Sequence, residues 1–257
     1  MTIEESRQQI INGISRIYEK TEADNIADLT LEHLTRFSPI ERILRKDLPL
    51  SAAQEKLLFQ IISRLQKHEP IQYVISEAWF AGFKVYVDNN VLVPRPETEE
   101  LVDWVIKEVT SQMPIASGST FKIIDVGTGS GCIAIALKRH LTDAEVWACD
   151  VSNEALNVAR INADALRAAI DFIPIDFLDE DQRKQLPHVD IIVSNPPYVP
   201  ESDKNEMRKN VLDFEPHLAL FVPGNDALIF YDAIADFGKD KLNDGGKIYL
   251  EIHEGIG

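Results

Sequence analysis

The sequence predicts an α/β protein in which a doubly wound, mostly parallel sheet follows a small all-helical domain. From residue 96 onward, short apolar segments alternate with segments whose apolar residues recur at helical spacing, as in a parallel sheet covered by helices. Residues 1–75 show helical periodicity alone. The chain has 257 residues, of which 45% are apolar, and this is enough for both domains to bury a core.

Residues 1–75 are expected to form a helical bundle. Capping boxes that begin at Ser38 and Ser51 mark two helix starts. Near the N-terminus, the residues that fall on one helical face are Ile10, Ile14, Ile17 and Tyr18. Because no titratable cluster lies in this segment, we interpret it as a structural or partner-docking domain.

Residues 76–95 read as a β-hairpin that links the two domains. Phe83, Val85 and Val87 alternate with polar or amphipathic neighbours, as in a strand buried on one face. Asp88-Asn89-Asn90 would supply the turn, and Val91–Val93 the second strand.

The rest of the chain, residues 96–257, is expected to alternate helices and strands. The predicted order is a helix from Pro96, a loop from Met113 to Thr120, a strand over 121–126, a helix from about 130, a strand over 145–149, a helix over 153–168, strands over 171–175 and 189–194, a long irregular stretch, a helix over about 225–242 and a strand over 247–252.

Charge and composition exclude several classes of protein. The net charge is −16, and residues 76–257 hold 16 Lys/Arg against 31 Asp/Glu, which argues against tight nucleic-acid binding. No apolar run reaches the ~18–20 residues of a membrane span, and the N-terminus lacks the features of a secretory signal, so we expect a cytoplasmic protein. Cys132 and Cys149 have no ligand spacing around them, so we expect no metal site.

A glycine-rich loop follows the predicted strand over 121–126. Its residues are Asp125, Gly127, Thr128, Gly129, Ser130 and Gly131. Glycines at the start of a helix let the backbone turn tightly and approach a ligand. The dinucleotide fingerprint G-x-G-x-x-G would need glycine at position 132, where this chain has cysteine, and this counts against NAD.

Acidic residues follow the next two strands. Asp150 ends the second strand, where a carboxylate can accept hydrogen bonds from a ribose diol, although an ordinary turn acid would look the same. If the ligand is an adenosylmethionine, Asp125 is placed to meet its amino group. Asp176 and Phe177 could hold an adenine by its amino group and its face, or be a turn acid beside a core phenylalanine.

The segment Asn195-Pro196-Pro197-Tyr198 follows the fourth strand and is the most informative part of the sequence. Two prolines stiffen the chain, and the Asn195 and Pro196 carbonyl oxygens can accept both hydrogens of one NH₂ group. Tyr198 offers a flat face to a planar acceptor. Holding both N–H bonds of a delocalised nitrogen can turn its lone pair toward an electrophile and stabilise the positive charge that develops.

With these motifs the sequence resembles the Rossmann-like class I methyltransferases that carry (N/D)PPY, and among them the HemK/PrmC family. The likeness includes Glu69–Tyr73, Val93–Glu99, Phe214–Pro216, Ala219-Leu220 and Leu250-Glu251. It implies methylation of the side-chain amide (N5) of the glutamine in the GGQ tripeptide of peptide-chain release factors. The cofactor would be S-adenosylmethionine, with S-adenosylhomocysteine as product.

The resemblance also implies roles for particular residues. The glycine loop, Asp150, Phe177 and Asn195 would contact the cofactor. The residues from Asn195 to Tyr198 would hold the glutamine, and Arg95 and Glu97 would line the substrate side. The helical domain would help recognise the release factor, and the enzyme would act as a monomer. Family members often have tryptophan at the position of Phe177, and they continue beyond the position of Gly257 into a further helix and a strand pair.

Three alternatives remain at this point. An adenine N6-methyltransferase of DNA or RNA would use the same NPPY chemistry, but the acidic charge disfavours it. A non-catalytic relative would have lost part of the glycine loop, Asp150 or Asn195, all of which are present. An NAD-dependent oxidoreductase is disfavoured by Cys132 and by the NPPY segment.

Overall fold

The computed structural model describes residues 1–112, 120–207 and 209–252. The chain divides into two compact units. The first comprises Met1–Ser76 with Arg208–Phe214, and the second comprises Glu77–Met207 with Glu215–Gly257. Among the described helices, none combines the length and the apolar content that a membrane span requires.

The regular elements of the first unit, within its described residues, are all helices. Its helices are α1 (Ile3–Ile14), α2 (Lys20–Thr35), α3 (Pro39–Leu44), α4 (Ala52–Leu65), α5 (Ile71–Ile75) and α10 (Lys209–Leu212). The predicted capping boxes at Ser38 and Ser51 are confirmed, and each closes the first turn of its helix. The prediction that Ile17 and Tyr18 continue the first helix was wrong, because α1 ends at Ile14. The Ser15 hydroxyl donates back to the Asn12 carbonyl, a local bond that competes with helix continuation.

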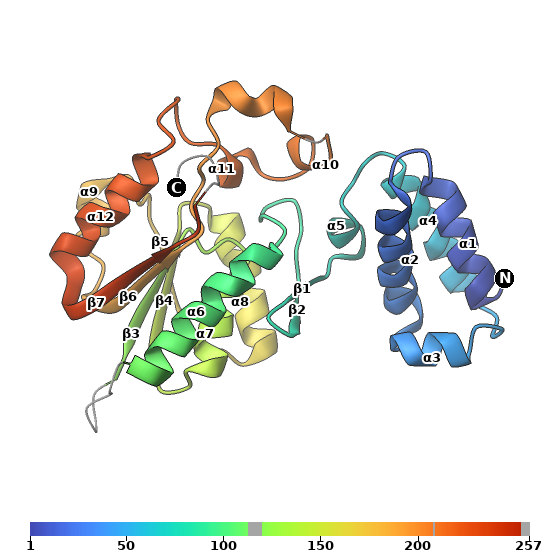
Figure 1. Ribbon diagram of the computed structural model, residues 1–257, viewed down its shortest axis with the longest axis horizontal. Helices are drawn as coiled ribbons and strands as arrows, with labels where there is room; N and C mark the ends of the chain where they lie inside the picture. Colours follow the sequence, from blue (N-terminus) through green and yellow to red (C-terminus); the bar gives the residue numbers. More distant parts are fainter. Residues whose placement is uncertain (113–119, 208, 253–257) are drawn as a thin grey trace. The chain divides into compact units, whose positions relative to one another are not determined.

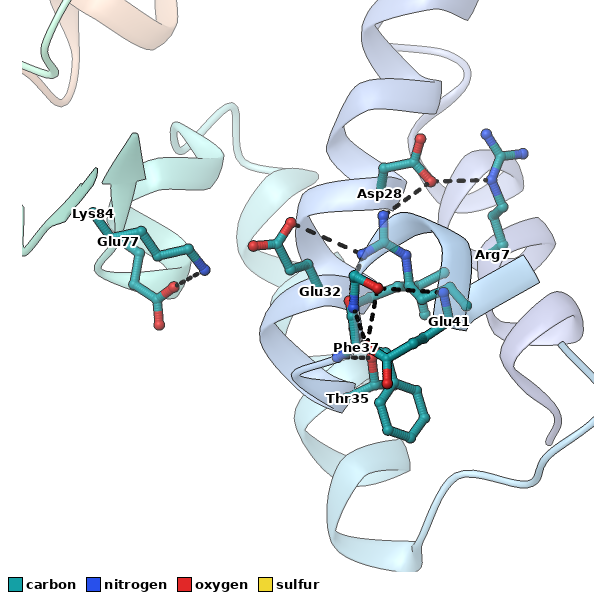
Figure 2. Close-up of polar contacts among 11 residues, drawn as sticks. Arg7, Asp28, Glu32, Thr35, Phe37, Glu41, Glu77 and Lys84 are labelled. Carbon is teal, nitrogen blue, oxygen red and sulfur yellow. Dashed lines mark hydrogen bonds and ion pairs between the residues drawn. The ribbon is translucent and has the colours of Figure 1, made fainter. Parts of the chain in front are cut away.

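Ion pairs connect three helices of the first unit (Figure 2). Arg42 on α3 is only 7% exposed, donates to the Phe37 carbonyl at 2.9 Å, and lies within 4.0 Å of Asp28 and 3.9 Å of Glu32 on α2. Arg7 on α1 reaches Asp28 at 3.5 Å. A buried guanidinium stabilises a fold only when its donors are paired, and here carboxylates and a carbonyl surround it.

The second unit begins with a β-hairpin, but its turn is not where the sequence predicted it. The strands are β1 (Ala78–Phe80) and β2 (Phe83–Val85), joined at Ala81 and Gly82, which both have positive φ. This two-residue turn suits the twist of a hairpin better than the longer Asp88–Asn90 segment. Val91–Val93 is not a strand. Lys84 and Glu77 form an ion pair at 2.9 Å beside the hairpin (Figure 2).

The predicted parallel sheet is confirmed. It has five strands in the order β5-β4-β3-β6-β7, and every neighbouring pair is parallel. The strands are β3 (Lys122–Val126), β4 (Glu145–Asp150), β5 (Asp171–Pro174), β6 (Val189–Ser194) and β7 (Leu242–Leu250). The order reverses between β3 and β6, which makes this the topological switch point of a doubly wound fold.

Helices cover both faces of the sheet. Figure 1 shows α6 (Pro96–Gln112), α7 (Cys132–His140) and α8 (Asn153–Leu166) along one face, and α9 (Glu180–Arg183) and α12 (Ile229–Lys241) along the other. Ile124, Ile192, Ile234 and Phe237 pack together in the core between the sheet and α12. Burial of such side chains is the main force that holds the layers together.

Two parts of the second half differ from the sequence prediction. The stretch after β6, expected to be irregular, contains η1 (Glu201–Glu206) and α11 (His217–Leu220). The last strand begins at Leu242 rather than at 247, because an irregularity in its pairing with β6 accommodates Gly245, whose φ is +81°. Most of the predicted loop from Met113 to Thr120 lies outside the described residues.

Candidate active site

A cavity of about 530 Å³ lies at the carboxyl ends of the parallel strands in the second unit. Its lining includes residues that follow β3, β4, β5 and β6, together with the segment before α6 and the region of α11. Its volume falls in the range of roughly 300–1,000 Å³ that small-molecule sites occupy. In doubly wound sheets, ligands bind at this edge, beside the switch point.

Four residues of the glycine loop, Gly127, Thr128, Gly129 and Ser130, form one wall of the cavity, and Gly131 lies outside its lining. Gly127, Gly129 and Gly131 all have positive φ, a conformation that other residues adopt only with strain. At Gly131 a Cβ atom would also lie 3.1 Å from the Cβ of Ala159 on α8. The loop therefore needs glycine both for its turn and for the close packing of α7 against α8.

Asp125 lies behind this loop and not in the cavity. Its side chain is fully buried and does not contribute to the lining, contrary to the expectation that it meets the ligand. One oxygen accepts hydrogen bonds from the Thr128 hydroxyl at 2.6 Å and from the Ala134 N–H at 3.2 Å. The other oxygen has no hydrogen-bond partner among the described residues. Burial raises the pKa of Asp125 from 3.8 to about 7.

Asp150 faces the cavity from the end of β4. One of its oxygens accepts the Gly129 N–H and the other the Ser152 N–H, each at 2.9 Å. Burial raises the pKa of Asp150, and the backbone donors oppose that shift. A carboxylate has about four acceptor positions, so Asp150 can hold the loop and still accept bonds from a ligand.

Asp176 and Phe177 line the cavity after β5. Phe177 is 5% exposed and packs edge-to-face on Phe237 of α12, with ring centroids 5.3 Å apart. Asp176 is exposed, and its side chain accepts the Leu178 N–H at 2.9 Å. This pair therefore offers one fixed aromatic ring and one solvated carboxylate.

The NPPY segment lies at the end of β6. Asn195, Pro196 and Pro197 line the cavity, whereas Tyr198 is half-buried outside the lining, and burial raises its pKa. The chain then leaves through Val199, whose N–H donates to the Leu220 carbonyl and whose carbonyl accepts the Val222 N–H. These bonds fix the segment at both ends, since Ser194 belongs to the sheet.

Arg95 lines the cavity and forms an ion pair that the sequence did not assign. Its guanidinium donates to both oxygens of Glu215, at 2.7 and 2.9 Å. Glu215 is 4% exposed and also accepts the Val93 N–H at 3.3 Å. Glu97, predicted beside Arg95, is exposed and lies outside the lining.

Three further residues support the site and were missed from the sequence. Asn162 on α8 bonds the backbone of Tyr86 and the Ser130 carbonyl, and so fixes the glycine loop to the segment after the hairpin. Thr98, which also lines the cavity, accepts a hydrogen bond from Asn195 and donates one to Glu251. No local pattern marks Asn162, whereas Thr98 and Glu251 fall inside motifs that already carried the family resemblance.

Comparison with known families identifies the class of protein. Residues 105–213 match the methyltransferase small domain, and residues 9–75 match the PrmC N-terminal domain. The first match includes the glycine loop and the NPPY segment. With the doubly wound sheet and its cavity, it defines the chain as a methyltransferase.

Curated relatives define the family. The release factor glutamine methyltransferase of Flavobacterium psychrophilum is 41% identical to this chain over 100% of the chain and 88% of its own length. The enzyme of the same name from Bacteroides thetaiotaomicron is 44% identical over 96% of the chain and 86% of its own length. The Lactococcus lactis enzyme of the same name is 45% identical over 77% of the chain and 68% of its own length. The chain therefore belongs to the release factor glutamine methyltransferase family.

Proposed function

We propose that the protein transfers a methyl group from S-adenosylmethionine to the side-chain amide nitrogen of the glutamine in the GGQ tripeptide of peptide-chain release factors. The observation that carries the proposal is the position of Asn195 and Pro196 in the wall of a cavity that the glycine loop also lines. Family membership supports the same acceptor, because the relatives are named for it.

The residues present fit the cofactor. The Asp150 carboxylate can accept hydrogen bonds from ribose hydroxyls, and Phe177 offers a buried apolar surface to an adenine. Gly127 and Gly129 have open space where a Cβ atom would be, so a ligand can approach their backbone closely. When bound there, S-adenosylmethionine would supply an electrophilic methyl group.

The protein's part in the reaction is to position the amide and stabilise charge. The Asn195 and Pro196 carbonyl oxygens would accept the two N–H bonds of the glutamine amide, which turns the nitrogen lone pair toward the methyl group. As positive charge develops on nitrogen, the same acceptors stabilise it. The proton can leave after the new bond has formed, so no strong base is required beforehand.

The other predicted residues take supporting roles in this proposal. Arg95, paired with Glu215, would contact the polypeptide around the glutamine, and Tyr198 would pack on the acceptor after a rearrangement that brings it to the cavity. Asp176 would contact the adenine end. The helical domain would help recognise the release factor. The proposed setting is the cytoplasm, where translation takes place, with the enzyme acting as a monomer.

The adenine N6-methyltransferase alternative uses the same chemistry but a different macromolecule. The 31 acidic against 16 basic residues in residues 76–257 disfavour a nucleic-acid substrate. The curated relatives likewise carry names for a protein substrate.

The test compares two methyl acceptors, a release factor and DNA, and compares the wild-type protein with the Asn195→Ala variant. Wild-type protein is incubated with labelled S-adenosylmethionine and either an unmethylated release factor or adenine-containing DNA. We expect transfer to the release factor alone, and a loss of at least about 100-fold in Asn195→Ala, the scale for removing a group that stabilises transition-state charge. Calorimetry should show that the variant still binds the cofactor. Near-normal turnover by Asn195→Ala would refute the role of the asparagine.

A further inference from the structure

The Asn195 amide is held by a chain of hydrogen bonds through Thr98, which also lines the cavity, to Glu251. Asn195 Nδ2 donates to the Thr98 hydroxyl at 3.1 Å, and that hydroxyl donates to Glu251 Oε2 at 2.6 Å. Thr98 is in the first turn of α6 and is 3% exposed. Glu251 directly follows β7, where its N–H donates to the Ser194 carbonyl at 3.0 Å. Three elements labelled in Figure 1, α6, β6 and β7, therefore converge on one side chain.

The chemistry of this chain of hydrogen bonds fixes its direction. An ionised carboxylate only accepts, so the single hydroxyl hydrogen of Thr98 points to Glu251. Toward Asn195 the hydroxyl can then only accept, so the amide must turn its NH₂ end to Thr98. Thr98 and Asn195, as donors toward Glu251, both act to lower the pKa of that carboxyl. The carbonyl end, Oδ1, is left for the cavity.

We propose that Thr98 and Glu251 are positioning residues that set the orientation of the Asn195 amide and thereby select a primary amide as the group to be methylated. The proposal rests on the function proposed above, in which Asn195 accepts an N–H bond of the substrate. An amide in the opposite orientation would present its NH₂ group and would favour a carboxylate over an amide. The carboxylate at the far end also polarises the chain of hydrogen bonds, which makes Oδ1 a stronger acceptor.

The negative charge of Glu251 is what allows only one orientation of the Asn195 amide. If the carboxyl were protonated, it could donate to Thr98, and the hydroxyl could then donate toward Asn195. Burial raises the pKa of Glu251. The charged groups that face it are Arg95, just before α6, which lowers that pKa, and Glu97, in the first turn of α6, which raises it further. Tyr231 on α12 and Tyr198 after β6 also face it.

The first test uses a matched pair of variants at Thr98. Thr98→Val keeps the shape and removes the hydroxyl, and Thr98→Ser keeps the hydroxyl. With a release factor as substrate, we expect Thr98→Val to lower kcat about 10- to 100-fold, because Asn195 is present but no longer held. Thr98→Ser should stay within about 3-fold of wild type, and the KM for S-adenosylmethionine should not change in either variant.

The second test measures binding without the cofactor. Calorimetry compares a GGQ peptide with the same peptide carrying glutamate in place of the glutamine. Wild type and Thr98→Ser should prefer the glutamine peptide, since Oδ1 repels a carboxylate. Thr98→Val and Glu251→Gln should lose most of this preference, because a valine or a glutamine at these positions allows either orientation of the Asn195 amide.

The pH dependence of kcat provides a third test, because it would not change if Glu251 had a purely structural role. Wild-type kcat should fall as the pH drops through the pKa of Glu251, which lies above its ordinary value of 4.5. Glu251→Gln should not show this loss of kcat at low pH.

The proposal is overturned if Thr98→Val equals Thr98→Ser in kcat and in peptide preference. If wild type itself transfers nothing to the release factor, the proposed function fails instead, and the peptide preference still reports on Thr98 and Glu251.

Discussion

At the scale of single residues, the two carboxylates beside the glycine loop have different roles. Asp150 faces the cavity with both oxygens already bonded to backbone N–H groups, and Asp125 lies behind the loop with no access to the cavity. The sequence placed both acids beside a ligand, because spacing along two parallel strands shows which edge they share but not which way each side chain points.

Replacing Asp150 should weaken cofactor binding. Asp150→Ala removes an acceptor for the ribose, and we expect a loss of about 1–3 kcal/mol, or about 5- to 150-fold in Kd, measured by calorimetry with S-adenosylmethionine. Asp179→Ala is the matched control, since Asp179 caps α9 outside the cavity. Unchanged affinity in Asp150→Ala would remove Asp150 from the cofactor site.

The buried Asp125 should make stability depend on pH. Its folded-state pKa of about 7 exceeds the ordinary 3.8, so the folded protein binds this proton more tightly than the unfolded chain. The resulting stability is fully present below about pH 4 and is lost as the pH rises through about 7. The difference between the two pKa values corresponds to roughly 4 kcal/mol at most.

Asp125→Asn isolates this effect. The asparagine oxygen can keep the bonds from Thr128 and Ala134, and the variant has no proton to lose. Urea unfolding of both proteins between pH 4 and pH 8 should show wild type losing about 2–4 kcal/mol relative to the variant. A difference that stays constant over this range would contradict the raised pKa.

At the scale of elements, the contact between α7 and α8 depends on Gly131. Its φ of +80° strains any other residue by about 1–2 kcal/mol, and a Cβ atom would also press on Ala159. Gly245 has nearly the same φ, +81°, but open space around it. Gly131→Ala should therefore destabilise the protein by about 1–3 kcal/mol more than Gly245→Ala does. Equal losses in urea unfolding would show that Ala159 makes room.

Element types followed from the sequence more reliably than element ends. The strands β3, β4 and β6 are largely apolar and mostly buried between helices, and their period and length identify them. The hairpin turn was placed about seven residues too late, because Asp88-Asn89-Asn90 has strong turn chemistry while Ala81-Gly82 has one glycine only. The sequence does not predict that β7 begins at Leu242, because two consecutive glycines interrupt the apolar pattern of this strand.

At the scale of the whole molecule, the site depends on contacts between residues far apart in the sequence. Thr98 and Glu251 are separated by 153 residues, and Arg95 and Glu215 by 120. Periodicity reports on neighbours within one element and cannot pair such residues. The motifs that carried the family resemblance contain all four, so the sequence marked them as important without showing that they bond.

Tandem mass spectrometry of the GGQ peptide, after incubation of an unmethylated release factor with the protein and S-adenosylmethionine, locates the transferred methyl group directly. We predict one added methyl group on the side-chain amide of the glutamine, and none when Asn195→Ala replaces wild type. A methyl group on another residue, or on adenine in a parallel incubation with DNA, would contradict methylation of the GGQ glutamine.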